Sequence, residues 1–283
     1  MNRIVISSLL VLSAIHLYLN PLQGQIAFSP SFVFLDSKSG VGDLLVTNNG
    51  NKTYEVRISL SFGYPTSDSL GNFTMNYADT LAYHQFALDP RIRYFPHAFL
   101  LPPGKQRTVR MQLNPSEKKK EGFFFTRVKI FATPTASPVS ETPTEEISTH
   151  LTFNFEQITA VFYHSGKVRT GLDLQKLEAN QQDSVLHLLL RLHRTGDSPF
   201  LGTLHARIKD DAGKVLAESR TTISVYFDFT RTLDLPLKGV PPGKYVLALS
   251  FETKRNDMLP QDPVQAPTKV HESAIEIRSF DDK

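Results

Sequence analysis

The chain has 283 residues, a formal net charge of +3 and no cysteine. So small a charge excludes electrostatic capture of nucleic acid as the main function, and the lack of cysteine excludes disulfides, thiol nucleophiles and cysteine metal sites. The fold must obtain its stability from core burial alone, and this length suffices for two domains of ordinary size.

The first 24 residues predict export. A single charge, Arg3, precedes an apolar run over 4–19, and a proline and small or polar residues follow before Gln25. This layout is typical of a secretory signal peptide. The apolar run contains serines and is shorter than the roughly 20 residues that span a bilayer, which disfavours a membrane anchor. We therefore expect a cleaved signal peptide over 1–24 and no stable membrane insertion.

Alternating apolar residues predict strands through the first half of the chain. In the segment 54–62 every second residue is large and apolar and the residues between are polar, as in a half-buried strand of an antiparallel sheet. The words NNGN at 48–51 and PPGK at 102–105 predict turns. Further strands are expected over 31–36, 43–47, 106–113, 122–134 and 150–163.

The second half repeats this pattern. Leucines occupy the even positions from 186 to 192, which predicts one buried strand face. Residues 203–219 predict a hairpin that turns at 211–213, and PPGK recurs at 241–244, where we again expect a hairpin turn. Further strands are expected over 223–237, 241–251 and 273–280.

The strand pattern predicts an all-β fold. Two runs of short strands favour two immunoglobulin-like β-sandwich domains, each of seven strands, joined by a short hinge within 164–171. We therefore expect a first domain over 25–166 and a second domain over 167–283.

The strand expected over 150–163 follows a loop, 132–149, that is too polar to build its own core. The strand opens with HLTFNFE, in which Leu151, Phe153 and Phe155 alternate with smaller or polar residues. Alternate apolar residues usually face the core of their own domain. Their other use is in a strand that is shared with a partner.

No catalytic constellation is found. The sequence lacks GxSxG, a phosphate-binding loop and HExxH, so we expect a protein that is not an enzyme. His187, His193 and His205 are the best metal candidates, but outward residues six apart on a strand lie too far from each other to share one ion. We expect neither a metal nor another cofactor.

Five segments of the first half follow one another in the order of a known family: SFVFLD, DLLVTNNGNKTYEVRISL, FPHAFLLPPGKQRTVRMQL, EGFFFTRVKIFATP and HLTFNFEQITAVFY. On these segments the chain resembles, over 26–166, the periplasmic pilus chaperones of the PapD-like family. The resemblance implies a periplasmic chaperone that caps exported β-rich, pilin-like subunits by lending them the strand around 150–163. It implies that Leu151, Phe153 and Phe155 bind the partner. An outer-membrane assembly pore is a second candidate partner.

The same resemblance implies a pair of cations that binds the terminal carboxylate of the subunit. The matching positions are Ser31 and Ala160, and neither carries a charge. Two interpretations stay open: the cations are supplied by residues from the set Lys38, Arg127, Lys129 and Lys167, or the chain has the fold without this anchor. Arg110 matches an arginine of the family pattern and is expected to have a structural role.

Two further hypotheses compete with the chaperone. In the first, the chain is a structural or adhesive cell-surface protein of Ig-like modules, and Leu151, Phe153 and Phe155 pack inside their own domain. The second, an enzyme, has no motif behind it. The periplasm is the expected location under the chaperone hypothesis, with the cell surface or secretion as the alternative.

Overall fold

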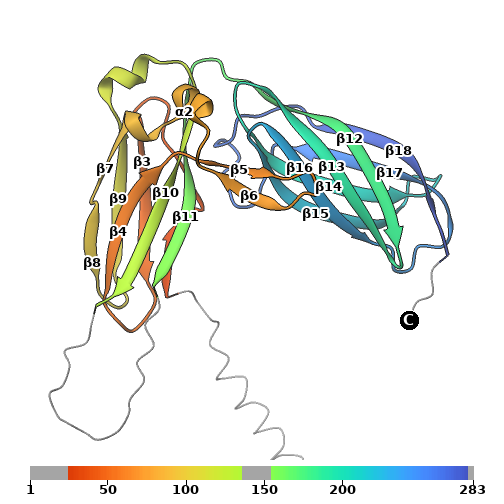
Figure 1. Cartoon of the computed structure of the whole chain (residues 1–283), viewed down its shortest axis with the longest axis horizontal. Coiled ribbons are helices and arrows are strands. Elements are labelled where there is room, and N and C mark those ends of the chain that lie inside the picture. Colours follow the sequence, from red (N-terminus) through yellow and green to blue (C-terminus); the bar gives the residue numbers. More distant parts are fainter. Residues whose placement is uncertain (1–24, 136–153, 280–283) are drawn as a thin grey trace, which may run out of the picture.

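The computed structural model describes residues 25–135 and 154–279. Two β-sandwiches lie at an angle to each other and are joined by a short connection between strands β11 and β12 (Figure 1). The predicted all-β fold of two sandwiches is confirmed. The predicted signal peptide, 1–24, lies outside the described residues.

The first sandwich consists of two sheets. One has the strand order β1-β3-β9-β7, and the other has the order β2-β11-β10-β4-β8. The strands are β1 (Ile26–Ser29), β2 (Phe32–Phe34), β3 (Val41–Asn48), β4 (Tyr54–Ser61), β7 (Ile92–Phe95), β8 (Ala98–Leu101), β9 (Gln106–Leu113), β10 (Gly122–Pro134) and β11 (Phe155–Ser165). The described part of this sandwich therefore has nine strands rather than the seven expected, because the short edge strands β1, β7 and β8 carry little periodicity.

Alternation decides which side chains enter the first core. In β4, Tyr54, Val56 and Ile58 are buried, whereas Arg57 and Ser59 are exposed, as predicted for a half-buried strand. The buried residues of both sheets form one continuous cluster. Burial of apolar surface in this cluster is the main source of stability for a chain that has no disulfide.

The second sandwich has seven strands in two sheets, β12-β13-β16 and β15-β14-β17-β18. They are β12 (Thr170–Gln182), β13 (Val185–Gly196), β14 (Phe200–Lys209), β15 (Val215–Val225), β16 (Asp228–Pro236), β17 (Gly243–Glu252) and β18 (Lys269–Ile277). The leucines at 186, 188, 190 and 192 are all buried in its core, and β14 and β15 form the predicted hairpin.

Several elements of the first half were not predicted. A hairpin formed by β5 (Tyr64–Ser67) and β6 (Phe73–Asn76) follows β4, and helix α2 (Thr80–Phe86) follows the hairpin. Two short 3-10 turns are η1 (Asp89–Arg91) and η2 (Pro115–Lys119). Figure 1 shows the hairpin reaching from the first sandwich to the side of the second.

The expectation that both PPGK words close hairpins is wrong. The first word links β8 to β9, which lie in opposite sheets of the first sandwich, and the second links β16 to β17, again in opposite sheets. The NNGN turn between β3 and β4 likewise joins the two sheets. Turn residues set the local backbone conformation, but the same turn chemistry serves a hairpin and a crossover between sheets.

A buried aromatic cluster connects the two sandwiches. Its members come from the outer face of the β11–β10–β4 sheet, from β5, from α2 and from the second sandwich: Phe62, Tyr64, Phe86, Phe123, Phe125, Phe162, Leu201 and Tyr226. The Tyr226 ring lies 4.7 Å from the Phe125 ring and 6.0 Å from the Tyr64 ring. The angle between the sandwiches is therefore fixed by packing and not by the connecting segment alone.

Candidate functional site

Strand β11 has one edge that is only partly paired. It pairs with β10 along its whole length, but on its other side it pairs with β2 only at Ala160–Phe162, in parallel register. Within the described residues no strand pairs with positions 155–159 on that side. The Phe162 carbonyl points to the β2 side, where it accepts a 2.8 Å bond from the Leu35 N–H. Backbone groups alternate along a strand, so those of Glu156 and Ile158 also point to the open edge.

The predicted partner-binding residues lie at and before the start of β11. Leu151 and Phe153 lie outside the described residues. Phe155 is half-buried against the core of the first sandwich, with its ring 5.8 Å from the Tyr54 ring in an edge-to-face arrangement. The binding of a partner by these three side chains stays a prediction.

Arg110 lies on β9 directly opposite Asp43 on β3. Its Nε and Nη2 donate to the two carboxylate oxygens of Asp43 at 3.0 and 3.1 Å. These hydrogen bonds lower the pKa of Asp43 below its ordinary value. The pair is largely exposed on the first sandwich and links two neighbouring strands.

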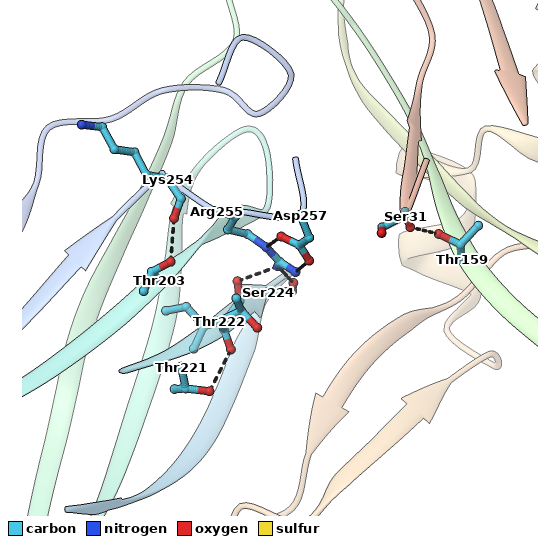
Figure 2. A network of polar contacts seen from close by, with 10 residues as sticks. Ser31, Thr159, Thr203, Thr221, Thr222, Ser224, Lys254, Arg255 and Asp257 are labelled. Carbon is cyan, nitrogen blue, oxygen red and sulfur yellow. Dashed lines mark hydrogen bonds and ion pairs between the residues drawn. The ribbon is translucent and has the colours of Figure 1, made fainter. Parts of the chain in front are cut away.

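Neither expected anchor position carries a charge, and both are used in local packing. Ser31 is exposed, and its carbonyl accepts a hydrogen bond from the Thr159 hydroxyl (Figure 2). Ala160 is completely buried. The residue opposite Ala160 on the neighbouring strand β10 is Arg127.

Arg127 is a buried cation with no acid partner among the described residues. Arg127 is only 8% exposed. Its Nε donates to the Gly63 carbonyl at 3.0 Å, and its Nη2 donates to the Tyr226 hydroxyl at 3.2 Å. Both acceptors are neutral. A buried charge without a compensating charge is costly, so an unpaired guanidinium at this depth indicates a site for an anion.

A cavity of about 220 Å³ opens beside Arg127 between the two sandwiches. A second arginine, Arg231 of β16, lines the same cavity. Its Nη2 donates to the Thr221 hydroxyl at 2.8 Å, whereas its Nε is buried and has no hydrogen-bond partner. Arg231 also lacks an acid partner within the described part of the chain. Two arginines that have no acid partner among the described residues therefore line one cavity.

A third arginine nearby, Arg255, is already neutralised. Its Nε and Nη2 donate to both carboxylate oxygens of Asp257 at 2.8 and 2.6 Å, and its Nη1 donates to the Ser224 hydroxyl at 2.8 Å (Figure 2). These bonds lower the pKa of Asp257. The guanidinium lies 4.9 Å from the centre of the Phe32 ring, so Arg255 supports the wall of the cavity that Phe32 lines.

The other three cations of the predicted alternatives lie elsewhere. Lys38 is exposed in the turn after β2. The Lys129 ammonium lies 4.9 Å from the centre of the Tyr77 ring. Lys167 lines a different cavity, at the hinge, together with Glu121 and Arg194. Of the four alternatives, Arg127 alone lines the cavity between the sandwiches. The contribution of Arg231 could not be predicted, because it comes from the other sandwich.

The histidines form separate pairs with acids. His187 contacts Asp234 at 2.7 Å, His193 contacts Asp228 at 2.6 Å and His205 contacts Glu218 at 2.9 Å. In the described ranges, no group of three or more histidine and acidic side chains is placed to hold a metal ion.

Comparison with known proteins gives matches in structure only. No family model matches the chain, and no curated protein matches it in sequence. Nor does any helix in the described ranges combine the length and apolar character needed to cross a membrane.

The similar solved structures include several chaperones. The YadV chaperone is 14% identical, with 89% of this chain and 100% of that chain covered and a TM-score of 0.43. A structure of the Salmonella enterica SafA pilin in complex with the SafB chaperone contains a chain that is 14% identical, with 87% of this chain and 95% of that chain covered and a TM-score of 0.43. The class 5 fimbriae chaperone CfaA is 9% identical, with 87% of this chain and 98% of that chain covered and a TM-score of 0.42. Each of these matches covers most of this chain.

Proposed function

We propose that the protein is a periplasmic chaperone that binds an exported β-rich subunit through β11. The carrying observation is the edge of β11 at 155–159, which no strand covers within the described residues. We place the border between the two domains at 166/167, so that this edge closes the first domain. The role is binding and not catalysis.

An open edge of this kind supports recognition by strand addition. Backbone N–H and C=O groups of Glu156 and Ile158 can pair with an extended segment of the subunit, and side chains at alternate positions then select it. Adding a strand extends both faces of the sheet. Core-facing side chains of β11, Phe155 among them, would then lie at the border between the core of the chaperone and that of the subunit, as we propose also for Leu151 and Phe153.

A finer part of the proposal concerns the C-terminal end of the bound segment. We place its terminal carboxylate in the cavity, where it would neutralise Arg127 and Arg231. Hydrogen bonds between guanidinium and carboxylate groups are short and about twice as strong as neutral ones. This arrangement replaces the cations missing at Ser31 and Ala160, because Arg127 reaches the same place from the neighbouring strand.

The test removes single edge N–H groups without changing the core. In Glu156→Pro and Ile158→Pro, the lost N–H points away from β10, and proline is tolerated on an edge in this orientation. Each lost hydrogen bond contributes about 1 kcal/mol. For each variant we expect thermal unfolding like that of the wild type and about a fivefold loss of the β-rich protein that co-purifies from the periplasm.

Glu156→Ala and Ile158→Ala are the matched controls, because they truncate the same side chains and keep the N–H groups. They should retain the partner. Equal recovery with the proline and alanine variants would contradict strand addition. Reproducible absence of any β-rich subunit from the wild-type preparation would contradict the chaperone role itself.

A second candidate function is a structural or adhesive surface module. The packing of Phe155 against Tyr54 in its own core favours it, since the same contact is expected of an ordinary core strand. Under this alternative the proline variants change no binding, and fractionation places the protein on the cell surface instead of in the periplasm.

A further inference from the structure

The β5–β6 hairpin, residues 64–76, forms an arm of the first sandwich that rests on the second. The Ser67 hydroxyl accepts a 2.6 Å hydrogen bond from the backbone N–H of Thr230 on β16. The Tyr64 ring lies 4.7 Å from the Phe227 ring. At the tip, Gly71 has a positive φ of +83°, and a Cβ there would lie 2.8 Å from the Thr232 methyl group. The arm therefore contacts Phe227 at its base and β16 along the rest of its length.

The arm also provides one wall of the cationic cavity. Pro65, Phe73 and Met75 line it from the arm, opposite Ile223 and Phe229 of the second sandwich. Phe73 is 63% exposed even though it lines the cavity. Exposed aromatic surface beside a concave site gains free energy when a ligand covers it.

The cavity thus combines two kinds of surface. Arg127 and Arg231 require an anion, whereas Phe73, Met75 and Phe229 favour an apolar group attached to it. An apolar cavity of about 150 Å³ is large enough for benzene. A cavity of about 220 Å³ can therefore hold one large apolar side chain beside a carboxylate.

We propose that the arm selects the last residue of the bound subunit, and that Phe73 and Met75 are its specificity-determining residues. The occupant is a polypeptide C-terminus whose final side chain is large and apolar. This inference rests on the proposed function, because that function brings a chain end to the cavity. It adds that the identity of the last residue is recognised by an element outside β11.

The experiment uses the purified protein and three labelled decapeptides of alternating valine and threonine. One ends in phenylalanine, one ends in serine, and the third is the phenylalanine peptide with a C-terminal amide. Fluorescence polarisation gives the dissociation constants. We expect the phenylalanine peptide to bind about tenfold or more tightly than the serine peptide, which corresponds to burial of one aromatic side chain.

The double variant Phe73→Ser/Met75→Ser should reduce this preference several-fold while the free carboxylate stays necessary for binding. Phe73 is mostly exposed, so the variant should fold, and thermal unfolding checks this. Phe95→Ser is the matched control: Phe95 is 71% exposed on the edge strand β7 and does not line the cavity. This control should keep the full preference.

The outcomes separate the two proposals. Equal affinity for the phenylalanine and serine peptides, with loss of binding for the amide, overturns the role of the arm and leaves the carboxylate site intact. An unchanged preference in the double variant also overturns it. Binding of neither peptide, or equal binding of the amide, overturns the carboxylate site and the role of the arm with it.

Discussion

At the scale of single residues, Arg110 and Asp43 form an ion pair between neighbouring strands of the first sandwich, and its exposure limits its contribution to stability. Their side chains are 67% and 44% exposed. Water and salt screen such pairs strongly. We measure the melting temperatures of Arg110→Gln, Asp43→Asn and the double variant. We expect the interaction between the two side chains to account for no more than a few degrees and to disappear at 1 M NaCl. Loss of partner binding in either variant would contradict a purely structural role.

The lowered pKa of His164 predicts how the free energy of unfolding changes with pH. Burial lowers the pKa of this side chain, which stacks on the Phe123 ring, below 6.5. The unfolded chain therefore binds a proton at a higher pH than the folded chain does. The stability linked to His164 is present above the unfolded pKa of 6.5 and is lost as the pH falls through it.

We expect the free energy of unfolding in urea to fall between pH 7.5 and 5.5 in the wild type, and to fall less in His164→Gln. The carboxylates whose pKa values are lowered, such as Asp43 and Asp257, lose their contribution only at more acidic pH. The other histidines are common to both proteins, so the difference isolates His164. Identical pH profiles would show that this side chain is solvated in the folded state.

At the scale of elements, Asp79 joins helix α2 to the arm. It is the N-cap of α2: its Oδ1 accepts from the Ala82 N–H at 2.9 Å. Its Oδ2 accepts from the Tyr64 hydroxyl at 2.6 Å. The two bonds lower the pKa of Asp79, and burial together with this carboxylate raises the pKa of Tyr64.

Asp79→Ala should lower the free energy of unfolding by about 1 kcal/mol from the lost cap, and by more if the Tyr64 bond adds to it. Asp79→Asn is the control, because asparagine is an equally good N-cap. Urea unfolding compares the two. Equal stability of the alanine and asparagine variants would mean that the cap does not contribute.

The strands could be predicted because each long strand buries one face. The even-numbered residues at 54–58 of β4 and at 186–192 of β13 are inside, as period two requires. Which strands pair could not be predicted, since PPGK and NNGN give the same local turn whether the chain returns to its own sheet or crosses to the other. The arm was missed because Phe73 and Leu70 are exposed and show no alternation between core and solvent.

At the scale of the whole molecule, the candidate site depends on pairing between distant segments. HLTFNFE predicted the start of this strand, of which the structure describes the part from Phe155 on, and the sharing of the strand with a partner stays a prediction. For the proposed anchor, the sequence offered Arg127 only as one of four candidate cations, because its position opposite Ala160 follows from the β10–β11 register. Arg231 comes from the second sandwich, and the sequence contains no signal that it lines the same cavity as Arg127.

The same contacts couple the stabilities of the two sandwiches. Tyr226 is buried in the interface, where its ring lies 4.7 Å from that of Phe125 and its hydroxyl accepts from Arg127. The Arg194 guanidinium lies 5.4 Å from the Phe86 ring and 5.0 Å from the Phe227 ring, and so bridges α2 and the second sandwich. Unfolding of one sandwich exposes these surfaces on the other. The wild type should therefore unfold in one calorimetric transition.

Tyr226→Ala should split that transition into two, because it removes the aromatic side chain that both sandwiches bury. Phe251→Ala is the matched control: Phe251 is equally buried, but in the core of the second sandwich alone. Both changes create a cavity that costs about 3–5 kcal/mol. The control should lower the melting temperature and keep one transition, because its interface is intact. A single transition in Tyr226→Ala would mean that the arm and Arg194 couple the sandwiches without this ring.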